Sequence, residues 1–233
     1  MPVTKRKPYL LRLSPILLCL FLQSFRKALV WSYQNGAWSS TLLPSECDVR
    51  TTTSVLAYSP TQPQPKLFAA AANNGAHTTS GGGYAQVLYY SQGEWVDTGL
   101  PTSDDPLYFV SLFGLVVDKD GNVYAGGQDS TYSGAVWKYN GSSWTSLNFP
   151  SISEEVADLA FNNKGVLYAG GFDEESFEGQ VWYYLNGIWT STHLKGSFDV
   201  YAIAIDSANL LYAIGTDVGG KAGIWSINAN QGA

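Results

Sequence analysis

The acidic side chains of this 233-residue sequence are its main candidates for ligand binding or catalysis. The densest group is Asp173-Glu174-Glu175 with Glu178, four carboxylates within six residues. Such a group can attract a basic protein, a cationic ligand or Ca²⁺, and two suitably spaced carboxylates can hydrolyse a glycosidic bond. The sequence shows no Ser-His-Asp arrangement, and its two histidines and two cysteines form no zinc-binding cluster. We therefore expect no metal, no cofactor and no catalytic residue.

An internal repeat predicts the strands and turns that carry these acidic side chains. Val136–Trp144 (VWKYNGSSW) and Val181–Trp189 (VWYYLNGIW) are related, and further copies begin at Val30, Val87 and Ile224. Upstream of these copies, the segment VYAGG at 123–127 matches LYAGG at 167–171 and LYAIG at 211–215, each 44 residues apart. The repeat is therefore the unit from which the fold is built.

Each repeat contains four short apolar segments, which we name strands a, b, c and d in chain order. Strand a is small and apolar on both faces, whereas strands c and d alternate aromatic and polar residues, as expected for half-solvated strands. Asn-Gly pairs between c and d predict tight hairpins. Four antiparallel strands that recur every 44 to 57 residues match a β-propeller blade. The predicted fold is all-β, a propeller of four-stranded antiparallel blades of about 44 residues.

The number of blades has more than one interpretation. Complete repeats cover 54–99, 109–148 and 155–193, while 200–228 holds only a, b and c and 29–42 holds only c and d. If the Trp38 strand supplies the missing d strand of the last blade, the ring has four blades, which we favour. If residues 15–21 instead form a b strand, the chain has five blades, or it is a truncated array and a fragment of a larger propeller without independent function.

The repeat resembles that of the kelch-like propellers. In that family, strand b ends in Gly-Gly and a spaced Tyr and Trp follow, as in Gly126-Gly127 with Tyr139 and Trp144. The same pattern recurs at Gly170-Gly171, Tyr184 and Trp189 over a region of about residues 54 to 228. The resemblance implies a β-propeller built from kelch-like repeats.

The first residues differ from the rest in charge and hydropathy. A basic leader precedes the apolar run Leu13–Leu22, a pattern typical of a secretory signal peptide and too short to span a bilayer. We therefore predict a signal peptide at 1–24, a propeller domain at 25–233, and a secreted or periplasmic protein without stable membrane insertion after leader removal. Beyond Lys27, 7 basic residues face 19 acidic ones, a net charge of −12 that disfavours nucleic-acid binding.

The b–c and d–a loops share one face of a propeller, and they are the long, variable connections in this sequence. Thirteen of the 19 acidic residues fall in these loops, where function usually concentrates on a rigid scaffold. The candidate partner-binding residues are the acids and loop aromatics Asp129, Tyr132, Asp173, Glu174, Glu175, Phe177, Glu178 and Asp217.

These features predict a non-enzymatic, secreted β-propeller that binds a protein partner through its acidic loop face. One alternative is a carbohydrate-binding, lectin-like propeller in which loop aromatics stack on sugars. Another is a glycan hydrolase or lyase that uses a pair of loop carboxylates. The expected partner is therefore a protein or a glycan.

Overall fold

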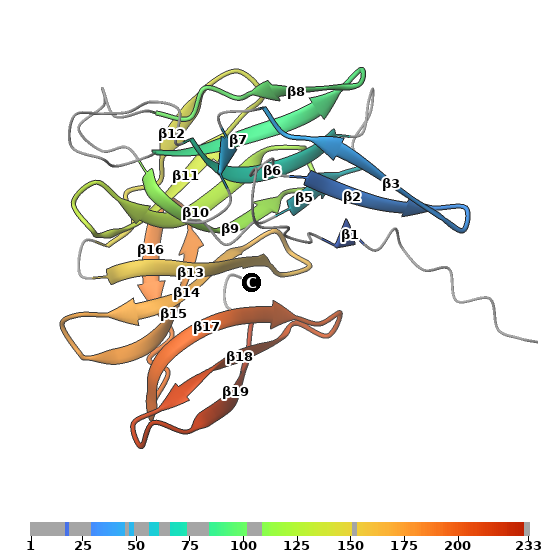
Figure 1. Ribbon diagram of the computed structural model, residues 1–233. Helices are drawn as coiled ribbons and strands as arrows, with labels where there is room; N and C mark the ends of the chain where they lie inside the picture. Colours follow the sequence, from blue (N-terminus) through green and yellow to red (C-terminus); the bar gives the residue numbers. More distant parts are fainter. Residues whose placement is uncertain are drawn as a thin grey trace, which may run out of the picture. The chain divides into compact units, whose positions relative to one another are not determined.

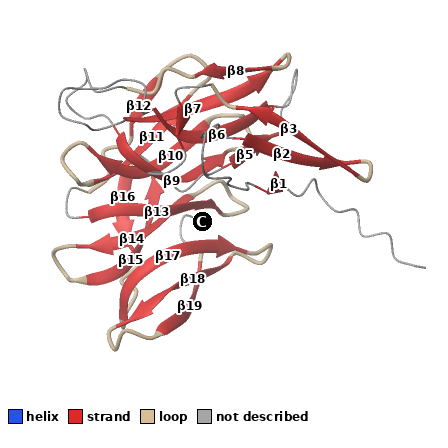
Figure 2. Ribbon diagram, viewed as in Figure 1, coloured by secondary structure: helices blue, strands red, loops and turns tan. Residues whose placement is uncertain are grey.

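A computed structural model describes residues 17–18, 29–44, 47–48, 56–60, 66–73, 84–101, 109–150 and 153–230. Within these ranges the chain forms strands and loops and no helix (Figure 2), as the sequence predicts. The chain divides into two compact units, Met1–Ser45 and Glu46–Ala233. Of the predicted signal peptide, only 17–18 lie within the described residues, so the signal peptide stays a prediction.

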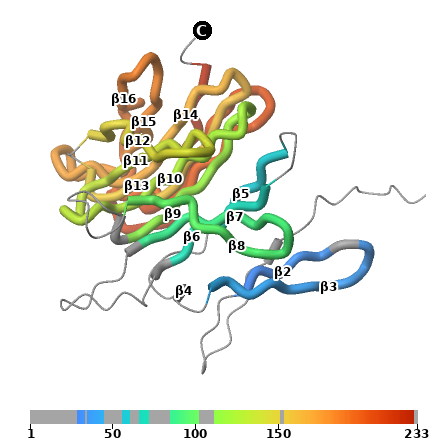
Figure 3. The backbone as a smooth tube through the Cα atoms, turned by 90° about the horizontal axis from the view of Figure 1, so that it is seen from above, coloured from blue at the N-terminus to red at the C-terminus, as the bar shows by residue number. Residues whose placement is uncertain are grey.

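The first unit contains one sheet with the order β1-β2-β3, formed by β1 (Leu17–Leu18), β2 (Leu29–Gln34) and β3 (Ala37–Leu42). The hairpin of β2 and β3 is the blue pair of strands in Figure 3. Its turn is Asn35-Gly36, with φ of 53° and 82°, so the Asn-Gly pair adopts the left-handed conformation that predicted this hairpin. Trp38 stacks against Tyr33 at 5.1 Å between ring centroids.

The second unit contains four further sheets (Figure 1). The second sheet consists of β4 (Cys47–Asp48), β5 (Leu56–Ser59), β6 (Lys66–Asn73), β7 (Tyr84–Ser91) and β8 (Glu94–Asp97). The third sheet consists of β9 (Phe109–Val117), β10 (Val123–Asp129), β11 (Gly134–Tyr139) and β12 (Trp144–Ser146). The fourth consists of β13 (Ser153–Phe161), β14 (Leu167–Asp173), β15 (Glu178–Leu185) and β16 (Ile188–Ser191). The last consists of β17 (Ser197–Ile205), β18 (Leu210–Asp217) and β19 (Ala222–Asn228).

The strand order bears on the blade count. The Trp38 strand, β3, pairs with β2, while the last sheet has three described strands in the order β17-β18-β19. The described residues therefore form five sheets, one in the first unit and four in the second, and the number of blades in the ring stays a prediction. Strand β1 pairs with β2 at Leu17↔Ser32, inside the segment that the five-blade alternative assigns to a b strand.

The core of the second unit lies between consecutive sheets. The strands in position a, β9, β13 and β17, lie side by side, and an apolar cluster fills each space between neighbouring sheets. The first glycine of each Gly-Gly pair allows this close approach. A Cβ atom at Gly126 would lie 2.7 Å from Val156 Cγ1, and one at Gly170 would lie 2.9 Å from Val200 Cγ1. Both distances are shorter than atomic contact allows, so sheet-to-sheet packing explains these glycines.

Candidate functional site

Three of the predicted acids occupy equivalent positions at the end of strand b. In each b–c turn the aspartate Oδ1 accepts backbone N–H groups from the turn that follows. Asp129 accepts from Thr131 at 2.8 Å, Asp173 from Glu175 at 2.9 Å, and Asp217 from Gly219 at 2.8 Å. Asp129 and Asp173 are also buried. One carboxylate oxygen of each aspartate therefore shapes the turn.

The tips of two b–c turns present exposed aromatic side chains in a strained backbone conformation. Tyr132 has φ of 62° and is 67% exposed, and Phe177 has φ of 53° and is 70% exposed. In the last sheet Gly220 takes this conformation, with φ of 73°. A bulky residue at positive φ costs about 1–3 kcal/mol, and such residues cluster at functional sites. The two aromatics therefore mark the turns as candidates for binding.

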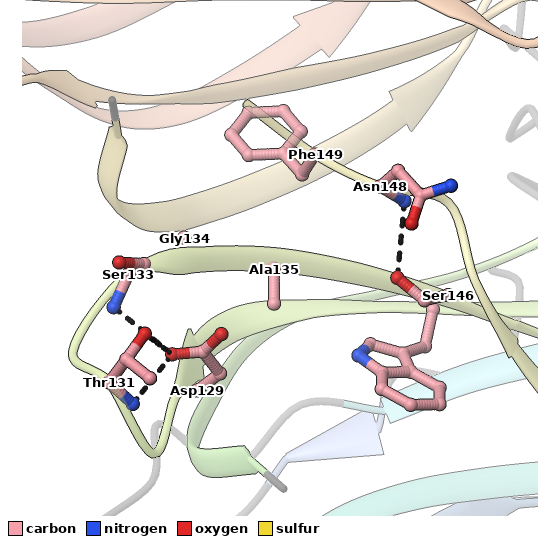
Figure 4. A pocket seen from close by; sticks show the side chains of 9 residues that line it. Asp129, Thr131, Ser133, Gly134, Ala135, Ser146, Asn148 and Phe149 are labelled. Carbon is pink, nitrogen blue, oxygen red and sulfur yellow. Dashed lines mark hydrogen bonds between the residues drawn. The ribbon is translucent and has the colours of Figure 1, made fainter. Parts of the chain in front are cut away.

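A pocket of about 290 Å³ lies beside the Tyr132 turn (Figure 4). Thr131 and Ser133, which flank Tyr132, line it together with Asp129. The opposite wall contains Asn148, whose N–H donates to Ser146 Oγ at 3.1 Å. Hydroxyl, amide and carboxylate groups thus line this pocket together with the apolar side chains of Ala135, Trp137 and Phe149, and none of its lining side chains is cationic.

An equivalent pocket of about 490 Å³ lies beside the Phe177 turn in the fourth sheet. The equivalence holds residue by residue, with Asp173, Trp182, Ser191 and His193 at the positions of Asp129, Trp137, Ser146 and Asn148. His193 repeats the backbone geometry of Asn148, with φ of 54° against 49°, and donates its N–H to Ser191 Oγ at 3.0 Å. The two pockets are therefore products of the same repeat.

The lining of the fourth-sheet pocket is charged. Glu175, Glu178 and Lys195 line it, together with Asp173 and His193. Gln180 holds the wall in place, because its Oε1 accepts from Ser191 Oγ at 3.0 Å and from Leu194 N at 3.1 Å. This pocket suits a ligand that carries several hydrogen-bonding groups.

The structure brings together only part of the predicted set. Asp173, Glu175 and Glu178 line the fourth-sheet pocket, and Asp129 lines the third-sheet pocket. Glu174 lies exposed in the turn outside the lining, and Asp217 belongs to the turn of the last sheet. Tyr132 and Phe177 stand at the turn tips between lining residues.

Sequence reasoning missed the second wall of each pocket. It assigned no binding role to His193, Gln180, Trp182 or Lys195. A usable signal was present, because Trp182 and His193 follow Trp137 and Asn148 at a common spacing of 45 residues. The repeat thus placed these residues beside the turn that carries the acids.

Two further acids occupy equivalent positions in neighbouring inner strands. Burial raises the pKa of Glu155, and the nearby charge of Asp199 raises it further. Burial likewise raises the pKa of Asp199. Asp199 Oδ1 and the neighbouring Thr216 Oγ1 are both buried without a hydrogen-bond partner.

In the described part of the chain no three His, Cys, Asp or Glu residues converge on a metal site, and no helix could span a membrane.

Comparisons with known proteins decide the fold. The chain is similar to a mutant of the Aleuria aurantia lectin in complex with alpha-methyl-L-fucoside, with a TM-score of 0.62 and 13% identity over 94% of this chain and 71% of that one. The same lectin in complex with Fucalpha1-6GlcNAc gives 0.59 and 13% over 89% and 69%. The chain has a β-propeller fold. No protein-family model and no curated protein matches the sequence, so the kelch-like resemblance stays a prediction.

Proposed function

We propose that this propeller binds carbohydrate through the equivalent pockets of its third and fourth sheets. The observation that carries the proposal is the recurrence of a pocket beside a b–c turn that bears an exposed aromatic, Tyr132 in one sheet and Phe177 in the other. Neither aromatic lines its pocket, and the Phe177 ring contacts Phe172, with 6.5 Å between ring centroids. A concave site with a few polar groups suits a small ligand. An aromatic ring supplies an apolar surface on which the C–H face of a sugar can stack.

The structural neighbours support this proposal over the binding of a basic protein. Both are complexes of a lectin with fucosides, and they share the propeller fold of this chain. The acidic loop face remains the argument for a protein partner, but Asp129, Asp173 and Asp217 each commit one carboxylate oxygen to a turn. Among the candidate residues, the acids that hold no such turn are Glu174, Glu175 and Glu178.

A glycan array probed with the full chain tests the proposal. We expect binding to persist at about 1 M salt, where surface charges are screened beyond a few ångströms. Tyr132→Ala and Phe177→Ala should each reduce binding, because each removes a stacking surface. Val218→Ala is the matched control, since Val218 is 71% exposed in the equivalent turn of the last sheet.

The outcome that contradicts the proposal is the absence of glycan binding in the wild-type chain, or binding that both aromatic variants retain. Binding to basic proteins that disappears at high salt and in Glu174→Gln, Glu175→Gln and Glu178→Gln would instead favour a protein partner.

A further inference from the structure

The turn between β11 and β12 carries the sequence Asn140-Gly141-Ser142, an Asn-x-Ser pattern that accepts N-linked oligosaccharides in secreted proteins. No other asparagine of the sequence is followed two positions later by serine or threonine. The Asn-Gly pairs of the corresponding turns in the first and fourth sheets are followed by Ala37 and Ile188. The motif is therefore confined to one turn of the repeat.

The Asn140 side chain shapes this turn with its oxygen and leaves its nitrogen free. Oδ1 accepts from Ser142 N at 3.0 Å, from Ser142 Oγ at 2.9 Å and from Ser143 N at 2.9 Å. Asn140 Nδ2 donates to no residue that the structure describes. An N-linked glycan bonds to Nδ2 and leaves the amide oxygen as an acceptor. Glycosylation therefore preserves every one of these hydrogen bonds.

The tip of the turn is open, although its base is anchored. Residues 140–143 are all exposed, and a Cβ atom placed at Gly141 would meet nothing within 4 Å. At the base, Tyr139 is buried and stacks on Trp144 with 5.1 Å between ring centroids. Tyr139 Oη also donates to Gly141 O at 2.9 Å. A large hydrophilic group therefore fits at the tip without displacing a packed side chain.

This turn and the third-sheet pocket belong to opposite ends of β11. The strand begins at Gly134, beside the b–c turn that forms the pocket, and ends at Tyr139, directly before Asn140. The last residue of β11 that lines the pocket is Trp137, three residues before Asn140, or about 10 Å along a strand. The Asn140 turn is therefore separate from the site proposed to bind carbohydrate.

We propose that Asn140 is the acceptor of an N-linked oligosaccharide, added as the chain enters a eukaryotic secretory compartment. The donor class is an oligosaccharide linked to a polyprenyl diphosphate. A bond forms between Asn140 Nδ2 and the anomeric carbon of the sugar, and the bond from that carbon to the diphosphate oxygen breaks. Nδ2 loses one proton, and the polyprenyl diphosphate leaves. The proposal rests on the predicted signal peptide and is independent of the carbohydrate-binding proposal.

Mass spectrometry of the full chain, produced in a eukaryotic host with its own leader, tests the site. We expect one N-linked glycan, which a peptide amidase removes while converting the modified asparagine to aspartate. Asn140→Gln and Ser142→Ala should each abolish the glycan, whereas Ser142→Thr should retain it, because threonine also completes the motif. Ser142→Ala keeps the Asn140 side chain, so it remains informative if Asn140→Gln fails to fold.

Ile188→Ser is a matched variant that adds the motif at the corresponding turn of the fourth sheet. It creates Asn-Gly-Ser at Asn186, where Ile188 is 66% exposed, and we expect a second glycan there. The proposal is overturned if the wild-type chain carries no glycan, whether or not it is exported. A glycan on Ile188→Ser alone would assign that failure to the Asn140 turn rather than to the leader. A glycan that survives in Ser142→Ala would also overturn the proposal.

Discussion

The third and fourth sheets use the same backbone to build two different pockets. In both, an aspartate ends strand b, an aromatic residue at positive φ forms the turn tip, and a left-handed residue after strand d closes the wall. The lining is neutral apart from Asp129 in the third sheet, whereas Glu175, Glu178, His193 and Lys195 line the fourth. The repeat therefore sets where each pocket lies, and the turn residues set what it can bind.

The largest expected loss of stability comes from substituting the second glycine of each Gly-Gly pair, and it tests whether the two sheets are built alike. A Cβ atom at Gly127 would collide with the carbonyl oxygen of Ser111, and one at Gly171 with that of Glu155. Because backbone cannot yield as a side chain can, Gly127→Ala and Gly171→Ala should each lower the free energy of unfolding by about 3 kcal/mol. Urea denaturation measures the effect. A large loss in one variant only would show that the two sheets are not built alike.

A smaller effect is expected from the aspartates that hold the turns. Asp129→Ala and Asp173→Ala leave turn N–H groups without acceptors and should each cost about 1–3 kcal/mol. Both aspartates accept a second backbone N–H, Asp129 from Ser133 at 3.2 Å and Asp173 from Ser176 at 3.1 Å. Asp129 also accepts from Thr131 Oγ1 at 2.7 Å, so its loss should cost more. Asp129→Asn and Asp173→Asn keep an acceptor oxygen and serve as controls. Thermal unfolding that ranks Asp173→Ala as the more damaging variant would contradict this account.

A difference between the third and fourth sheets should also appear in how their contribution to stability depends on pH. Glu155 in the fourth sheet stands where Ser111 stands in the third, and burial raises the pKa of Glu155 above its ordinary 4.5. A raised pKa in the folded state means that the folded chain binds more protons than the unfolded chain. Stability from this group is therefore present below pH 4.5 and decreases as pH rises through the raised value.

Glu155→Gln tests this sign, because it removes the titrating group and keeps the shape. We expect the variant to gain stability relative to wild type as pH rises above 4.5. Chemical denaturation at a series of pH values measures the difference. A constant difference across that range would mean that Glu155 titrates normally in the folded chain.

The sequence predicted the repeat but not the walls of the pockets. The spacing of 44 to 57 residues predicted the three complete sheets, because each strand pattern and tight turn is local. The β2–β3 hairpin was predicted from its local Asn-Gly turn, whereas the number of blades in the ring depends on contacts far apart in sequence, which no local pattern reveals. His193 and Gln180 were missed for a similar reason, since they meet Asp173 only after β15 and β16 fold back along β14.

The strained aromatics give the most direct test of the claim that the turns serve binding. Glycine adopts positive φ without strain, as Gly220 does in the last sheet, so Tyr132→Gly and Phe177→Gly should raise the free energy of unfolding by about 1 kcal/mol each. The same variants should lose binding on the glycan array. Gain of stability with loss of glycan binding is the result we predict. Glycan binding that survives in the double variant would contradict the account.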